Sequence, residues 1–363
     1  MADQRILLVG ATGVFGSRLA ELAAREPGLD LTLCARGRTK LEALGARLGG
    51  LPVRVLDRER ITADDLAGFN VVIDAAGPFQ ASTPTVIEAA IVARVHYIDL
   101  ADGRAFVAAI GAHDAAAKAA KISVTTGASS IPALSHAVID ALTCGWQGID
   151  RIKIGIFPGN RAPRGLAVVQ AILSYVGRPV RVWRAGCWTD VPGWGLVHRW
   201  RIPGVGARWA SVCDTPEQDL LVEHYRPHES AEFFAGMELS ILHLGLALLA
   251  SPVRWGWIAS LRPASRPLLA IAKWLLPFGS DIGAMDIRIC GRDAEGETRE
   301  ARWTLRADGN RGPYVPTLAA LTMLRRLRDG MPPPAGAHAC VGLLTLVESE
   351  ADFDRLGIVT CRA

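Results

Sequence analysis

The chain has 363 residues, of which half are hydrophobic and 21% are charged, a globular composition long enough for two domains. The formal net charge is +4 and the basic residues are interspersed with acidic ones, which excludes the basic patch of a nucleic-acid-binding protein. Seven scattered cysteines without C-x-x-C spacing, and no signal peptide ahead of the first apolar run, predict a reducing cytoplasmic setting.

A glycine-rich turn near the N-terminus carries the clearest functional signal. Residues 6–9 are apolar, as in a buried parallel strand, and residues 15–24 have helical spacing. The turn between them lets a pyrophosphate approach bare backbone at a helix N-terminus, so it predicts a dinucleotide site, with a ligand-free tight turn as the alternative. The residues of this turn expected to bind the cofactor are Gly10, Thr12, Gly13, Val14, Phe15 and Gly16.

Strands and helices alternate through the rest of the first half. Five further runs have the composition of buried strands, and they cover residues 29–34, 53–56, 71–75, 96–100 and 122–126. Helices are expected between them. This pattern predicts an α/β fold, a doubly wound Rossmann sheet of parallel strands that binds its ligand outside the carboxyl ends of the strands.

Residues at these strand ends indicate which cofactor is bound. An acidic residue after the second strand would accept a hydrogen bond from the ribose 2′-hydroxyl of NAD. This chain instead has Arg36 and Arg38, whose positive charges favour the 2′-phosphate of NADP. NADP is therefore expected, with NAD as the alternative, although Arg38 has a second reading as a solvated helix residue. Asp57 after the third strand either approaches the adenine or caps a turn. The segment expected beside the nicotinamide after the fourth strand is Ala76, Gly77, Pro78 and Phe79.

Acid–base chemistry is predicted at the end of the fifth strand. Asp99 and Tyr97 are the candidate catalytic residues, because a carboxylate and a phenol there would lie near a bound nicotinamide. None of the four tyrosines has a lysine four residues later, so the dyad of short-chain dehydrogenases is absent. His224 and His228 have metal-compatible spacing but no obvious third ligand, and no metal site is expected.

Several motifs of the first half resemble the saccharopine dehydrogenase-like NAD(P)-binding family. They are Gly-Ala-Thr-Gly-Val-Phe-Gly (10–16), Cys-Ala-Arg (34–36), Val-Val-Ile-Asp-Ala-Ala-Gly-Pro-Phe (71–79), His-Tyr-Ile-Asp-Leu (96–100) and Ser-Ser-Ile-Pro-Ala-Leu-Ser (129–135). The Gly-Pro-Phe segment is also similar to the trans-acting enoyl reductase branch. The resemblance implies an NAD(P)-dependent oxidoreductase in which a second domain is inserted before the chain returns to the nucleotide-binding domain.

The pattern changes from residue 151 onward to that of a mixed or antiparallel sheet with helices. Ile152, Ile154 and Ile156 alternate with less apolar residues, and residues 285–292 and 297–307 predict a hairpin. We therefore expect an NAD(P)-binding domain of residues 1–145 plus about 310–363. Residues 146–309 are expected to form an α+β domain for substrate binding and dimerisation.

Apolar residues of the second half leave two alternatives open. Residues 239–261 and 267–278 are interrupted by charges and prolines, so buried helices are expected, and helices lying on a membrane surface are the second reading. A cluster of tryptophans either packs in the core or lines a flat substrate pocket. These tryptophans are Trp183, Trp188, Trp194, Trp200 and Trp209.

Taken together, these features predict an NADP-dependent oxidoreductase that transfers a hydride to a carbonyl, imine or enoyl substrate. A small-molecule substrate and a homodimer are expected, without nucleic acid, and a membrane surface is an alternative partner that is not expected. One competing interpretation is a dinucleotide-binding regulatory or scaffold protein without catalysis. Another is a membrane-associated partner of a lipid-synthesis enzyme.

Overall fold

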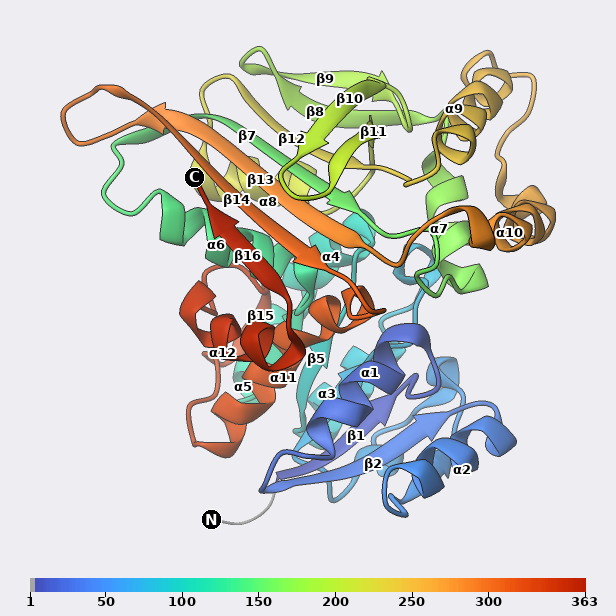
Figure 1. Ribbon diagram of the computed structural model, residues 1–363. Coiled ribbons are helices and arrows are strands. Elements are labelled where there is room, and N and C mark those ends of the chain that lie inside the picture. Colours follow the sequence, from blue (N-terminus) through green and yellow to red (C-terminus); the bar gives the residue numbers. More distant parts are fainter. Residues whose placement is uncertain (1–3) are drawn as a thin grey trace. The chain divides into compact units, whose positions relative to one another are not determined.

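The computed structural model describes residues 4–363, and they divide into two compact units (Figure 1). The first unit contains the described residues up to Leu134 together with Pro313–Leu344. The second contains Ser135–Gly312 together with Thr345–Ala363. Each unit is built on a sheet of its own.

The first unit is a doubly wound parallel sheet. Its strands are β1 (Gln4–Val9), β2 (Leu29–Ala35), β3 (Val53–Val55), β4 (Val71–Asp74), β5 (His96–Asp99), β6 (Ser123–Thr126) and β15 (Gly336–Ala339). They lie in the order β15-β6-β5-β4-β1-β2-β3, and every neighbouring pair is parallel. The strand order reverses between β1 and β4, where such sheets bind their ligand. The predicted Rossmann fold is confirmed, and β15 adds a seventh strand that was not predicted.

Helices connect these strands. They are α1 (Val14–Ala23), α2 (Arg38–Arg47), α3 (Thr85–Ala93), α4 (Arg104–Ala108), α5 (Asp114–Ala120) and α11 (Val315–Arg328). The returning helix α11 packs against α1 within the same unit, as the expected return of the chain requires. Apolar residues of the strands, such as Leu7, Val72 and Val124, form the buried core between sheet and helices.

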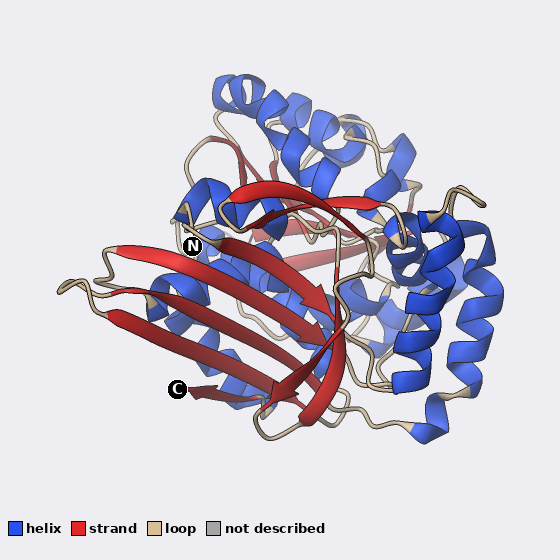
Figure 2. Ribbon diagram, turned by 90° about the horizontal axis from the view of Figure 1, so that it is seen from above, coloured by secondary structure: helices blue, strands red, loops and turns tan. Residues whose placement is uncertain are grey.

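The second unit is built on a larger mixed sheet. Its strands are β7 (Gly148–Phe157), β8 (Pro179–Arg184), β9 (Cys187–Pro192), β10 (His198–Ile202), β11 (Gly206–Val212), β12 (Ser230–Ala235), β13 (Gly283–Arg292), β14 (Thr298–Ala307) and β16 (Val359–Arg362). Strand β7 pairs antiparallel with β13 as expected, but its other edge pairs in parallel with β12. The predicted hairpin is β13 and β14, whose long strands run side by side in Figure 2.

Helices of the second unit are α6 (Ser135–Leu142), α7 (Leu166–Tyr175), α8 (Glu217–Tyr225), α9 (Ser240–Arg254), α10 (Ser265–Trp274) and α12 (Leu346–Leu356). Two of the clustered tryptophans, Trp194 and Trp200, are buried. Trp200 packs on Phe157 and donates from Nε1 to Asp286 at 3.2 Å, so it serves the core. The core reading therefore holds for Trp194 and Trp200.

The boundaries of the two units differ from the expected domains at the C-terminus and near residue 140. Residues 345–363 were expected in the nucleotide-binding domain, but they lie in the second unit because β16 pairs antiparallel with β14. Trp303 of β14 also contacts Phe353 of α12. Helix α6 likewise lies in the second unit, since it packs on β13 and β14.

The apolar stretches at 239–261 and 267–278 form α9 and α10. The expectation that both helices are buried is wrong, because α9 keeps an exposed apolar face and only Ser265 of α10 is buried. Within residues 4–363, no helix has the length and apolar character needed to cross a membrane.

Candidate functional site

The candidate site lies at the carboxyl ends of adjacent strands of the first unit. In the sheet register, Val9 at the end of β1 is opposite Asp74 at the end of β4, and Asp74 is opposite Asp99 at the end of β5. The turns that follow these three strands therefore begin at the same edge of the sheet. This edge flanks the reversal of strand order, where a dinucleotide is bound in folds of this kind.

Two of the three glycines in the turn after β1 are required by the fold. Gly10 has a φ of +79°, and a Cβ there would lie 2.7 Å from the backbone of Ala75 and Ala76. A Cβ on Gly16 would overlap the carbonyl oxygen of Gly10. Gly10 thus lets the turn pass beside the end of β4, and Gly16 lets α1 pack onto the turn.

Gly13 differs from the other two, because a Cβ there would come no closer to backbone than 3.1 Å, at the carbonyl oxygen of Gly10. It is exposed and stands as the N-cap of α1 in an extended conformation, with no side chain capping the helix. The first N–H groups of a helix have no acceptor within it, and the helix dipole makes this end favourable for an anion. With half-buried Thr12, Val14 and Phe15 beside it, the turn has the features that a pyrophosphate site needs, and its role as one stays a prediction.

Cations stand at the end of β2. Arg36 is exposed and has no ion-pair or hydrogen-bond partner within residues 4–363, whereas Arg38 pairs with Glu42 at 3.2 Å. The ion pair with Glu42 therefore favours the alternative that Arg38 is a solvated residue of α2. Asp57 accepts from the backbone N–H of Glu59 at 3.3 Å and caps the turn after β3.

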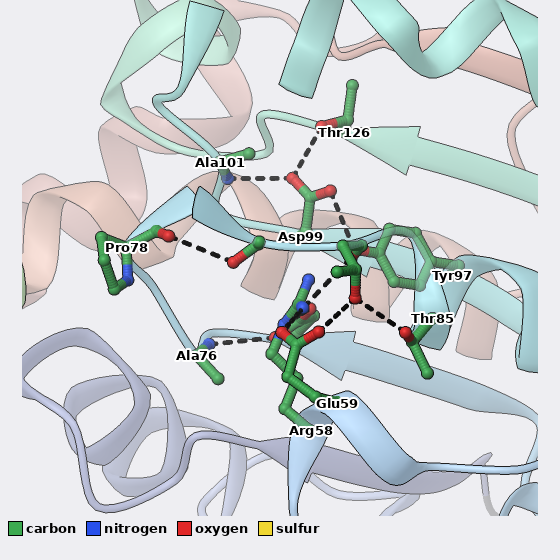
Figure 3. Close-up of polar contacts among 12 residues, drawn as sticks. Arg58, Glu59, Ala76, Pro78, Thr85, Tyr97, Asp99, Ala101 and Thr126 are labelled. Carbon is green, nitrogen blue, oxygen red and sulfur yellow. Dashed lines mark hydrogen bonds and ion pairs between the residues drawn. The ribbon is translucent and has the colours of Figure 1, made fainter. Parts of the chain in front are cut away.

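A buried ion pair joins the ends of β3 and β4. The Nε of Arg58 lies 2.7 Å from Oδ2 of Asp74, and these side chains are 7% and 0% exposed. Arg58 also contacts Glu59 at 2.6 Å and donates to the carbonyl of Thr83 at 3.1 Å (Figure 3). Because each buried charge has its counter-charge, the pair holds the turn after β3 against the end of β4.

The segment after β4 is held by this ion pair. The second oxygen of Asp74 accepts from the backbone N–H of Ala76 at 3.0 Å, and Arg58 lies over the ring of Phe79 at 5.7 Å. Phe79 is buried, whereas Gly77 is exposed and Pro78 is half-buried. The predicted nicotinamide segment is therefore a fixed loop whose exposed point is Gly77.

Asp99 and Tyr97 lie together at the end of β5, as expected, and both are buried. Four donors converge on the Asp99 carboxyl group. Figure 3 shows three of them: the Tyr97 hydroxyl at 3.0 Å, the Ala101 N–H at 2.9 Å and the Thr126 hydroxyl at 2.9 Å. The fourth is the Gly127 N–H at 2.7 Å. Burial raises the pKa of Asp99 to about 7, while the hydrogen bonds from Gly127, Ala101 and Thr126 oppose the rise. The group thus ties the loops after β5 and β6 together.

Sequence reasoning missed the Arg58–Asp74 pair. Arg58 stands in a run of charged residues after β3, which resembles an ordinary solvated turn. The available signal was Asp74, an acidic residue that ends an otherwise apolar strand. A carboxylate buried in such a strand needs a cation or several donors, and the sequence does not say which of the many arginines supplies it.

Comparison with known families agrees with this geometry. Residues 6–138 match the sequence model described as the saccharopine dehydrogenase NADP binding domain, a range that includes every site residue discussed above. The resemblance drawn from the sequence is therefore confirmed. The prediction of an NADP-binding Rossmann domain is confirmed with it.

One solved structure shows the same fold over the whole chain. Apo saccharopine dehydrogenase (L-Glu forming) from Saccharomyces cerevisiae matches with a TM-score of 0.71 at 14% identity, covering 99% of both chains. A meso-dapdh mutant from Clostridium tetani has a TM-score of 0.46 at 10% identity, covering 95% of this chain and 94% of its own. A probable dehydrogenase from Thermotoga maritima also has a TM-score of 0.46, at 11% identity, covering 92% and 91%. No curated protein sequence matches this chain.

Proposed function

We propose that the chain is an NADP-dependent oxidoreductase that transfers a hydride to a carbonyl, imine or enoyl substrate, because residues 6–138 match the saccharopine dehydrogenase NADP binding domain. The observation that carries the NADP preference is the cation Arg36 at the end of β2, where an NAD-specific site has an acid. The bound cofactor supplies the hydride. The chain holds its pyrophosphate at the Gly13 turn and its 2′-phosphate at Arg36.

Replacing Arg36 tests the cofactor preference. We expect wild-type protein to bind NADPH more tightly than NADH, and Arg36→Asp to lower the NADPH affinity by about ten- to a hundredfold, because a charge-assisted contact is lost and a repulsive one is added. NADH affinity should change little or rise. Titration calorimetry with both cofactors measures all four constants.

The matched control is Arg25→Asp, which makes the same charge change at another exposed position. Arg25 follows the C-terminal end of α1, away from the pyrophosphate turn at its start. This variant should bind both cofactors as wild type does. A wild-type preference for NADH, or equal effects of the two substitutions, would disprove the role of Arg36.

The catalytic assignment of Asp99 and Tyr97 stays a prediction, and the contacts favour an indirect role. Neither side chain is exposed, and Asp99 uses both oxygens to fix the loops after β5 and β6. We propose that Asp99 positions the backbone beside the nicotinamide, with Tyr97 holding one of its oxygens. Its charge is required, because all four neighbours donate to it.

Asp99→Asn removes the negative charge and nearly preserves the size of the side chain. Its amide oxygen can still accept hydrogen bonds from Ala101, Thr126 and Gly127. We expect NADPH affinity near wild type and turnover lowered roughly tenfold or more, because small displacements at a reacting centre are costly. Wild-type turnover should rise as the pH passes about 7, where Asp99 ionises, and the variant should lack this step. NADPH oxidation with a panel of ketones, imines and enoyl thioesters provides the assay. Unchanged turnover and pH profile would remove Asp99 from the mechanism.

Location and assembly are proposals of the same kind. All seven cysteines are free thiols, and Cys34, Cys213, Cys290 and Cys340 are buried. Free thiols agree with a reducing compartment, which supports the proposed cytoplasmic location. The homodimer stays a prediction, which sedimentation velocity would test.

A further inference from the structure

An apolar surface lies on α9, α10 and the turns beside them in the second unit, and we name it the α9–α10 surface. Ten of the 17 exposed large apolar side chains within residues 4–363 fall between positions 241 and 278. Its six most exposed members, each between 61 and 75% exposed, are Ile241, Leu248, Trp255, Trp257, Trp274 and Phe278. Such a concentration on one surface indicates a binding site.

Core packing does not account for this surface. Helix α9 buries one face through Leu246, Ala250 and Val253, and it packs on β11. Ile241 and Leu248 are seven residues apart, which is about two helical turns, so they lie on the same side of α9. They form part of a second apolar face, which remains exposed. Helix α10 packs on α7 yet exposes most of its side chains. Figure 1 shows α9 and α10 on the same side of this unit.

The exposed charges within residues 239–280 are all of one sign. The sequence from position 239 to position 280 contains no Asp or Glu, although acidic residues make up 36 of the 363 residues, roughly one in ten. Four cations occur in the same stretch: Arg254, Arg262, Arg266 and Lys273. All four are exposed. The surface is therefore both apolar and positively charged.

We propose that the α9–α10 surface binds the surface of an anionic lipid bilayer. Tryptophans favour the boundary between headgroups and acyl chains, and exposed lysines and arginines beside them attract anionic headgroups. A second copy of this chain fits less well, because a two-fold interface would bring four cations against the same four. The protein lies on the membrane through this surface without crossing it.

Vesicle flotation tests the apolar part of the proposal. Wild-type protein should float with vesicles of phosphatidylglycerol and phosphatidylcholine and remain behind with pure phosphatidylcholine. Trp255→Ser/Trp257→Ser/Trp274→Ser should lower the bound fraction at least about tenfold, because the side chains that insert are removed. The matched control is Trp188→Ser, which removes a partly exposed tryptophan from β9 and should float as wild type. Thermal unfolding confirms that each variant is folded.

Charge reversal tests the electrostatic part. Arg262→Glu/Lys273→Glu should weaken binding to the anionic vesicles at least about tenfold, and raised salt should weaken wild-type binding in the same direction. Arg25→Glu/Arg292→Glu reverses two exposed cations elsewhere and should have little effect. Absence of wild-type flotation, or flotation that the tryptophan and charge variants do not alter, would overturn the proposal. So would a wild-type dimer that the triple tryptophan variant abolishes, without flotation, because the occupant would then be a second copy.

Discussion

Gly13→Val is expected to lower the affinity for NADPH by at least about a hundredfold while the chain remains folded. A Cβ at this position would lie 3.1 Å from the carbonyl oxygen of Gly10, which would have to shift by a few tenths of an ångström, and the residue is exposed. The valine side chain would instead occupy the space in which a pyrophosphate approaches the start of α1. Calorimetric titration with NADPH measures the loss, and circular dichroism monitors the fold.

The chain offers a close control for this substitution. Gly165 is the N-cap of α7 with φ −80° and ψ 158°, nearly the conformation of Gly13, which has φ −73° and ψ 173°. Gly165→Val therefore makes the same change at a helix start in the other unit, and it should leave NADPH affinity unchanged. Gly16→Val should destabilise the fold itself, because its side chain would overlap backbone. Wild-type NADPH affinity in Gly13→Val would show that the pyrophosphate binds elsewhere.

Arg58→Met is expected to lower the free energy of unfolding by about 3 kcal/mol or more. The substitution removes the cation that pairs with the buried Asp74 carboxylate. The backbone N–H of Ala76 still donates a hydrogen bond to that carboxylate. Asp74→Asn should cost less, because Arg58 keeps its contacts with Glu59 and Thr83. Combining both substitutions should cost less than the sum of the two, since no charge is then left without a partner. Urea unfolding of the three variants measures these differences.

An exposed ion pair of similar length provides the control. Lys118 and Asp114 are 2.6 Å apart on α5, with side chains 61% and 35% exposed. Lys118→Met should change stability by less than about 1 kcal/mol, because water solvates the remaining carboxylate. Equal losses in Lys118→Met and Arg58→Met would mean that burial does not strengthen the Arg58–Asp74 pair.

The sequence allowed the sheet of the first unit to be predicted where its strands are strongly apolar. Runs such as residues 6–9 and 71–74 have few structural alternatives, and the glycines after β1 fix a turn between strand and helix. Strand β15 was missed because Gly-Ala-His-Ala has neither β-branched residues nor an apolar run. Its strand conformation comes from pairing with β6, which lies more than 200 positions earlier in the chain.

The candidate site could be predicted only in part for a related reason. The pyrophosphate turn and Arg36 are local features, each readable from a few consecutive residues. The four donors around Asp99 include Thr126 and Gly127, and these come together only once β5 and β6 have paired. In α9, Leu246 and Leu248 are equally apolar, so the sequence does not indicate which of them is buried. The structure shows that Leu246 is buried and that Leu248 is exposed.

The positions of β15 and β16 in the chain determine when each sheet can be completed during synthesis. Strand β15 completes the sheet of the first unit beside β6, and β16 completes that of the second beside β14. Both belong to the final 28 residues of the chain. A ribosome that has synthesised everything before Gly336 has therefore produced two sheets that each lack an edge strand. The nascent chain has to keep the open edges of β6 and β14 away from other strands until Gly336–Ala339 and Val359–Arg362 have been synthesised.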